Sequence, residues 1–186
     1  MKAKSLFILT VVVAMVFWGC EEHAYINAPS VDNPQIPDSI PELVGPEPTP
    51  DPEGADIPEG CLNVYEALKV CKKLAPGAVT SDSLYVKGWI YELDASKHQS
   101  GMTEYGNATF YICPTNDGKA TKFSIEAYQV YGKGKKAFEK TEVGLSKVQV
   151  GDFVVLRGKF TNYSNQVYET EGRGNAYIYY SNNPNF

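Results

Sequence analysis

The chain has 186 residues, of which 43% are hydrophobic and 21% charged, and its formal net charge at pH 7 is −5. The charge divides unevenly: residues 21–59 hold ten acidic side chains and no Lys or Arg, whereas residues 61–186 hold fifteen basic and twelve acidic ones. The acidic net charge of the whole chain comes from residues 21–59. The folded part after them is mildly positive and can therefore carry a basic surface. About 125 residues follow residue 60, enough for one domain with a core that needs no disulfide support.

The first twenty residues have the pattern of a secretion signal. Lys2 and Lys4 precede an apolar run, 6–18, and Gly19 and Cys20 follow it. The run is too short and wrongly flanked to remain as a membrane span. With its cysteine directly after a small residue, the segment resembles a bacterial lipoprotein signal. That resemblance implies that residues 1–19 are removed and that the thiol of Cys20 carries lipid and anchors the chain to a membrane. A plain secretory signal peptide is the alternative.

Two acidic residues, Glu21 and Glu22, follow the anchor. They resemble the acidic export signal of surface-exposed lipoproteins in Bacteroidetes-type bacteria. The resemblance implies an outer membrane lipoprotein in the cell envelope that faces outward. The alternative is that the pair simply begins an acidic linker.

Residues 20–60 form an acidic, proline-rich tether. Nine of the chain's twelve prolines fall in it. The tether lacks the apolar content that would offset the entropy of ordering it, so none of it is expected to pack. As a semi-rigid spacer, its proline-rich stretch, residues 28–59, could reach about 3.1 Å per residue, roughly 100 Å in all.

The folded domain, residues 61–186, is expected to begin with a helix. Val64, Ala67, Leu68, Cys71 and Leu74 recur at helical spacing, and this stripe is expected to cover one face or one end of a sheet. Asn63 and Glu66 have the spacing of a capping box, and Pro76-Gly77 stops the helix. Cys71 belongs to the stripe and is expected to be a small buried hydrophobe. With lipid on Cys20, an odd number of cysteines remains, so at least one thiol stays free or pairs between chains.

Runs rich in Val, Ile, Tyr and Phe predict five strands, with a further short strand at 166–170; the five are 84–93, 107–113, 122–131, 153–160 and 176–180. Gly88 and Gly158 lie inside such runs and predict bends or bulges where strands turn corners. No long apolar helix separates the strands. The fold class predicted is all-β with one N-terminal capping helix, the strands forming a five-stranded antiparallel barrel.

From residue 62 to residue 182 the chain resembles the OB-fold domains of Bacteroidetes-type secreted lipoproteins. The resemblance rests on residues 63–68, 85–90 and 105–112, and most strongly on residues 148–160, which Tyr163 and Glu169 follow. It implies an OB-fold-like barrel. It does not imply an activity, because OB folds host many unrelated functions.

The sequence of the domain gives little support to a catalytic function. Its single histidine, His98, lies in a loop pattern and is expected to be solvated. Asp94 and Glu104 flank the same loop, where acidic side chains serve mostly for solvation, and Cys113 has no evident histidine partner. No metal-ligand spacing and no glycine-rich phosphate cradle is present. We therefore expect no enzyme, no metal and no cofactor.

Aromatic residues are the domain's most distinctive feature. Aromatic rings stack on sugars and on nucleobases, and neighbouring cations can contact phosphate. The ligand-binding candidates are Trp89, Tyr91, Tyr111, Tyr128, Arg157, Lys159 and Tyr163. The alternative for any one ring is that it packs beneath a loop or the helix.

Three functions follow from these features. The first is a lipid-anchored, non-enzymatic binding module for a glycan or protein. The second is a nucleic-acid-binding protein, and the third is a structural or assembly lipoprotein. The lysine cluster at 133, 135, 136 and 140 is the natural phosphate-binding candidate, although charge runs in loops are usually just solvated.

Overall fold

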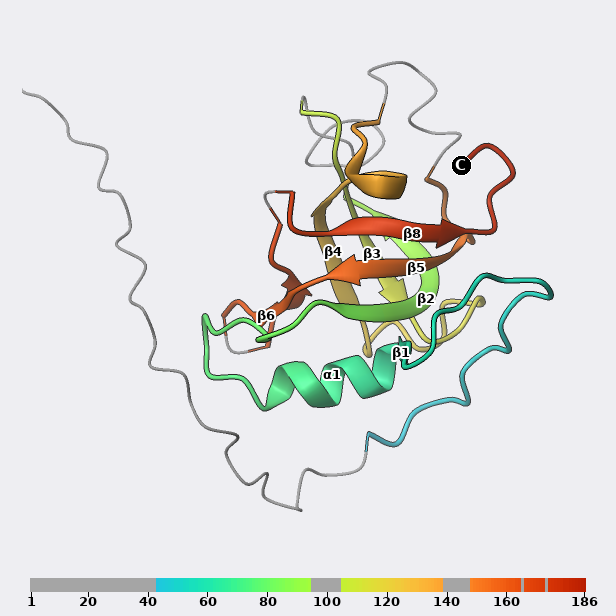
Figure 1. The fold of residues 1–186 in the computed structure, drawn as a ribbon. Coiled ribbons are helices and arrows are strands. Elements are labelled where there is room, and N and C mark those ends of the chain that lie inside the picture. The colour runs from blue at the N-terminus through green and yellow to red at the C-terminus, as the bar shows by residue number, and fades with distance from the viewer. Residues whose placement is uncertain (1–42, 95–104, 139–147, 165, 173) are drawn as a thin grey trace, which may run out of the picture. The chain divides into compact units, whose positions relative to one another are not determined.

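The computed structural model describes residues 43–94, 105–138, 148–164, 166–172 and 174–186 (Figure 1). All of them belong to one compact unit, Ile36–Phe186. The predicted signal peptide and Cys20 lie outside the described residues. In the part of the chain that is described, no helix has both the length and the apolar character to cross a membrane. The elements are β1 (Leu62–Asn63), α1 (Val64–Lys72), β2 (Leu84–Leu93), β3 (Ala108–Cys113), β4 (Ile125–Val130), the 3-10 helix η2 (Lys133–Lys135), β5 (Phe153–Gly158), β6 (Phe160–Asn162), β7 (Tyr168–Thr170) and β8 (Tyr177–Ser181).

The helix α1 forms as predicted. The side chain of Asn63 accepts a hydrogen bond from the backbone N–H of Glu66 at 3.0 Å, and the Glu66 carboxylate accepts one from the N–H of Asn63 at 2.7 Å. This capping box satisfies two N–H groups that the first turn leaves without partners. Val64, Ala67, Leu68 and Cys71 of the stripe are buried in the core, which confirms the predicted role of Cys71, whereas Leu74 lies beyond the end of α1 and is half-buried. Figure 1 shows α1 lying across one side of the sheet.

The strands form one mixed sheet with the order β6-β7-β4-β3-β2-β5-β8, and β1 pairs with β2 outside this path. The fold is mostly β with one short helix among the described residues, as predicted. The prediction of a closed barrel of five antiparallel strands is wrong. The sheet has eight strands and is open, and two of its strand pairs, β1·β2 and β4·β7, are parallel. One isolated parallel bridge, Tyr131↔Tyr177, joins the end of β4 to β8.

The strand count differs because one predicted run is divided and the short strand β1 was not predicted. The run 153–160 breaks at Lys159 into β5 and β6, so that its second half can pair with β7 instead of β8. The short β1 pairs with β2 immediately before the helix. The run 84–93 coincides with β2, which confirms that prediction to the residue.

Gly88 has a different role from the predicted bend. The pairing of β2 with β5 is regular from Leu84 to Trp89, and the irregularity in β2 falls between Ile90 and Glu92. A Cβ atom at Gly88 would lie 2.8 Å from Cγ2 of Val64. Gly88 is therefore needed for the close approach of α1 to the sheet.

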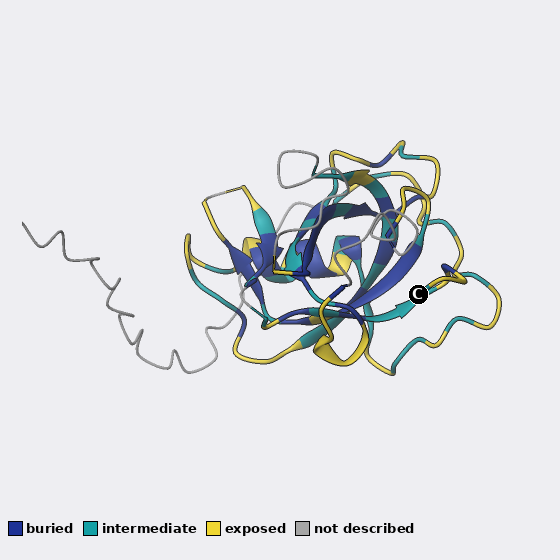
Figure 2. Ribbon diagram, turned by 90° about the horizontal axis from the view of Figure 1, so that it is seen from above, coloured by how far each residue is buried: buried dark blue, intermediate teal, exposed yellow. Residues whose placement is uncertain are grey.

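The outer face of β5 is buried as well as the inner one. Strand alternation puts Phe153 and Val155 on the opposite face from Val154 and Leu156, yet all four are buried. The ring of Phe153 lies between those of Trp89, at 5.2 Å, and Tyr180, at 6.4 Å. Aromatic side chains of β2 and β8 thus cover β5 from outside. Figure 2 shows the buried strands inside a periphery of exposed loops.

The second half of the tether packs on the domain. Residues 43–60, which we call the strap, contain no helix or strand, but Leu43 packs against the core and Tyr65 donates a hydrogen bond to the carbonyl of Pro46 at 2.7 Å. The prediction that no part of the tether packs is wrong for the strap. Its contacts are with backbone and side-chain groups far along the chain, which composition does not reveal.

Candidate functional site

The most distinctive surface feature is a groove beside the hairpin of β6 and β7. It encloses about 280 Å³. Two tyrosines, two glutamates and two smaller side chains line this tyrosine–glutamate groove: Glu126, Tyr128, Tyr163, Ser164, Val167 and Glu169. The two glutamates come from neighbouring parallel strands, because Glu126 of β4 is the register partner of Glu169 of β7.

Tyr128 owes its position to a β-bulge in β4. The register between β3 and β4 shifts between Ala108 and Phe110, so β4 carries an extra residue there. Gln129, next to Tyr128, has a φ of 49°, and its N–H donates to Oγ1 of Thr109 at 3.1 Å. Bulges redirect side chains and occur often beside functional sites. The Tyr128 ring lies so close to Gly172 that a Cβ atom there would be 2.7 Å from its Cδ1.

The loop between β6 and β7 supplies the other wall. The N–H of Tyr163 donates to the carbonyl of Val167 at 2.9 Å, which closes the hairpin. Tyr163 is 63% exposed and Val167 is 38% exposed, so both present apolar surface to solvent. Glu169 is only 8% exposed and lies at the base. Oγ1 of Thr170 donates to the carbonyl of Tyr128 at 2.8 Å and fixes β7 to β4.

A second pair of tyrosines continues from the groove across the sheet. Tyr111 of β3 is the register partner of Glu126, and its ring centroid lies 6.1 Å from that of Tyr91 on β2. Burial, and after it the charge of Glu126, raises the pKa of Tyr111 to about 12. Its phenol is a protonated donor at neutral pH, as in an ordinary tyrosine, and the raised pKa keeps it protonated to higher pH. We call Tyr91, Tyr111, Glu126 and Glu169 the outer row.

Arg157 is engaged by tyrosines elsewhere on the sheet. Its guanidinium lies 5.5 Å from the ring centroid of Tyr85 and 5.9 Å from that of Tyr177, and it donates to the Tyr177 hydroxyl at 3.1 Å. Lys159 is half-buried at the junction of β5 and β6. Neither residue lines the groove.

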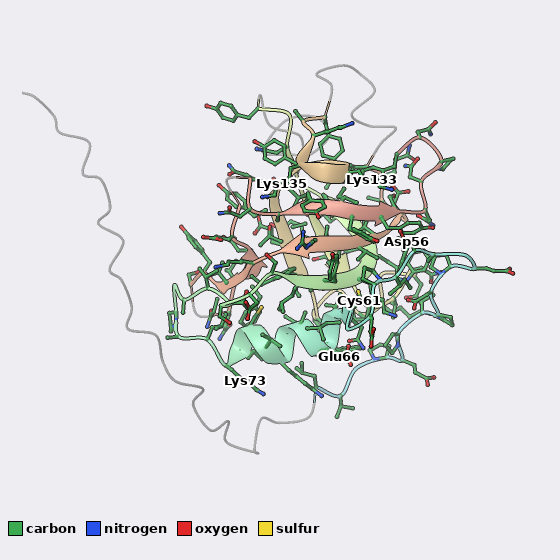
Figure 3. The ribbon with its side chains drawn as sticks, in the orientation of Figure 1. Asp56, Cys61, Glu66, Lys73, Lys133 and Lys135 are labelled. Atoms are coloured by element: carbon green, nitrogen blue, oxygen red, sulfur yellow. The ribbon has the colours of Figure 1, made fainter. Side chains whose placement is uncertain are left out.

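Trp89 does not line the tyrosine–glutamate groove but a second pocket. This pocket of about 200 Å³ is lined by strap residues and by the sheet, including Lys87, Trp89 and Phe153. Of the lysine cluster, Lys133, Lys135 and Lys136 are exposed, and Lys140 lies outside the described residues. Figure 3 places Lys133 and Lys135 at the end of the domain away from α1 and the labelled Glu66.

The structure therefore divides the seven predicted site residues. It brings Tyr128 and Tyr163 into one groove and places Tyr91 and Tyr111 along the outer row, but it puts Trp89 and Arg157 in separate surroundings. Sequence reasoning missed both glutamates. The alternation of β4 could have placed Glu126 beside Tyr128 on the outer face. Glu169 could not be placed, because it depends on a parallel pairing of strands far apart in the sequence.

The surroundings of Cys113 do not favour a catalytic role. Cys113 is buried, its thiol donates to the carbonyl of Thr115 at 3.1 Å, and burial raises its pKa, which disfavours a nucleophilic thiolate. Burial likewise raises the pKa of Cys61 to about 11 and that of Cys71 to about 12. His98 and Glu104 lie outside the described residues. Among the described residues no group of three or more His, Cys, Asp or Glu could hold a metal ion.

Neither a protein-family model nor a curated protein sequence matches this chain.

Proposed function

We propose that this protein is a non-enzymatic binding module for a glycan, and that the tyrosine–glutamate groove is its binding site. We propose further that lipid on Cys20 anchors it to the outer membrane, facing outward. The observation that carries the glycan assignment is the convergence of two tyrosines and two glutamates on one groove of about 280 Å³. This volume is close to the lower limit of about 300 Å³ for small-ligand pockets.

The chemistry of the groove suits a sugar. The exposed ring of Tyr163 offers an apolar face on which the C–H face of a pyranose can stack. Carboxylates only accept hydrogen bonds, so Glu126 and Glu169 suit the hydroxyl donors of the same ring. The outer row extends these polar and aromatic groups to β2, which favours a chain of several sugars over a single one.

The fold assignment in this proposal is an OB-like barrel that is partly open, with additional strands at one edge of the sheet. The parallel bridge Tyr131↔Tyr177 supports it, since the N–H of Tyr131 donates to Ala176 at 3.1 Å and the N–H of Ile178 donates to Tyr131 at 2.8 Å. These bonds link β4 to β8 at the two ends of the series β4-β3-β2-β5-β8. OB barrels bind oligosaccharides as well as oligonucleotides.

The charge of the groove argues against nucleic acid as the ligand there. Two adjacent carboxylates would repel a phosphate backbone. The basic candidates lie elsewhere, with Arg157 held by Tyr85 and Tyr177.

The proposal is tested by Tyr163→Ala. Removing the exposed ring should strongly reduce retention on a column of a polysaccharide that the wild type retains, because the sugar loses the aromatic face on which it stacks. The fold should be unaffected, since Tyr163 lies in a loop and is 63% exposed. Retention and melting temperature are measured together.

Tyr105→Ala is the matched control. Tyr105 is also an exposed tyrosine, at 68%, but it does not line the groove. Its loss should leave retention unchanged. Equal retention of wild type and Tyr163→Ala, or equal losses in both variants, would overturn the assignment to this groove.

A further inference from the structure

The strap follows an unusual path for a proline-rich segment. Residues 48–51 line a pocket beside the middle of β2 and the end of β3, and turns at residues 52–55 and 58–61 then bring the chain back to β1 (Figure 1). None of its residues is buried. It is thus a peptide lying on a surface, and not part of the core.

Specific contacts hold the strap at its middle. The N–H of Thr49 donates to the carbonyl of Pro114 at 3.1 Å, while Oγ1 of Thr49 accepts from the N–H of Asn116 at 3.0 Å. The carboxylate of Asp51 forms an ion pair with Lys87 of β2. These contacts involve backbone groups, a hydroxyl and a charge, which is how grooves recognise extended peptides.

A further contact lies near the end of the strap. Desolvation, and after it the carboxylate of Asp56, raises the pKa of Tyr179 on β8, so this strap residue lies near the Tyr179 hydroxyl. Figure 3 labels Asp56 in the strap beside the sheet. The strap is therefore paired with β2 through Asp51 and lies near β8 at Asp56.

We propose that the surface beneath the strap is a docking site for an extended, acidic, proline-spaced peptide of a partner protein, and that the strap is its resident occupant. The site is formed by Lys87, Trp89, Pro114 and Phe153. Charge complementarity supports this occupant, because Lys87 already pairs with an acidic strap residue. This inference concerns a different surface from the tyrosine–glutamate groove and stands independently of glycan binding.

The strap fills this site incompletely. A pocket of about 200 Å³ remains between Pro48–Asp51 of the strap and the sheet residues Trp89 and Phe153. Pro50, which faces the pocket, is exposed and small. A partner peptide with a larger apolar side chain at the position of Pro50 would fill the pocket against the two rings and should bind more tightly than the strap does.

Trp89 provides a local probe of the site. The sequence has two tryptophans, and Trp18 lies in the predicted signal peptide, so Trp89 is the single tryptophan from residue 20 onward. Its fluorescence should report a peptide that enters the pocket.

The experiment uses the chain from residue 20 onward and a released-strap variant, Thr49→Pro/Asp51→Ala, which removes the N–H and the hydroxyl of Thr49 and the carboxylate of Asp51. Two synthetic peptides are titrated, one with the sequence of residues 43–60 and one with Leu at the position of Pro50. Both should give a saturable change in Trp89 emission with the variant, and the leucine peptide should bind more tightly. The wild-type chain should respond at least about tenfold more weakly, because its own strap competes at an effective concentration of order millimolar.

A charge exchange separates recognition from a general effect on folding. Adding Lys87→Glu to the released-strap variant should weaken binding of the 43–60 peptide about tenfold, and a peptide with Lys at the position of Asp51 should restore it. The absence of a saturable response in the folded released-strap variant would overturn the proposal. So would binding that is indifferent to both charge changes.

Discussion

The pKa of Tyr111 depends on its neighbours in the outer row. Its phenol is partly buried on β3, and Glu126 is its register partner on β4. Desolvation and the neighbouring carboxylate both disfavour the phenolate, and together they raise the pKa of Tyr111 to about 12 from an ordinary value of 10.0. The protonated phenol is thus available as a hydrogen-bond donor next to the glutamates of the groove.

Glu126→Gln tests this account. Removing the charge should lower the pKa of Tyr111 but leave it above its ordinary value, because desolvation is the larger cause and is unchanged. The Tyr111 contribution is the difference in phenolate absorbance between a protein and its Tyr111→Phe counterpart, measured against pH while the fold is monitored by circular dichroism. An unchanged pKa in Glu126→Gln would contradict the arrangement of the outer row.

The same shift makes stability depend on pH with a definite sign. Between pH 10.0 and about 12 the unfolded chain loses the Tyr111 proton before the folded one does. This group therefore stabilises the fold fully below pH 10, and its contribution falls as the pH rises to about 12. The free energy of unfolding of Tyr111→Phe should fall less steeply over this interval than that of the wild type.

At the scale of elements, α1 depends on the capping box at its N-terminus and on its close contact with the sheet. The capping box joins Asn63 and Glu66, and the bare Cα of Gly88 lets Val64 approach the sheet. The stripe of α1 then fills the core beneath β2. The helix therefore connects the strap, which ends just before β1, to the sheet.

Asn63→Ala should destabilise the protein by about 1 kcal/mol, because it removes the acceptor for the N–H of Glu66. Asn63→Asp keeps an acceptor at this position and should retain most of the stability. Chemical denaturation of the two variants and the wild type provides the comparison. Equal losses in both would show that the cap does not stabilise the helix.

The features predicted correctly from the sequence are those set by neighbours along the chain. The capping box and the bounds of β2 follow from residue spacing and alternation. The division of the fourth run at Lys159 and the parallel pairing of β4 with β7 depend on strands far apart in the sequence. For the same reason Tyr163 could be recognised as a binding candidate, whereas its neighbour Glu169 in the groove could not.

At the scale of the whole molecule, the two candidate sites use different surfaces and different chemistry. The tyrosine–glutamate groove lies between β4 and the β6–β7 hairpin, whereas the strap lies over β2 and the loop after β3. The folded unit includes the strap, so binding measurements need a chain that retains residues 43–60. A domain cut at residue 60 would lose the occupant of the second surface.

The most direct measurement of the central claim is binding of the chain from residue 20 onward to arrays of glycans and single-stranded oligonucleotides at two salt concentrations. The account predicts glycan binding that changes little with salt, because Tyr163 and the two glutamates of the groove recognise rings and hydroxyls rather than phosphates. Oligonucleotide binding that falls steeply with salt would contradict it, as would the absence of any bound glycan.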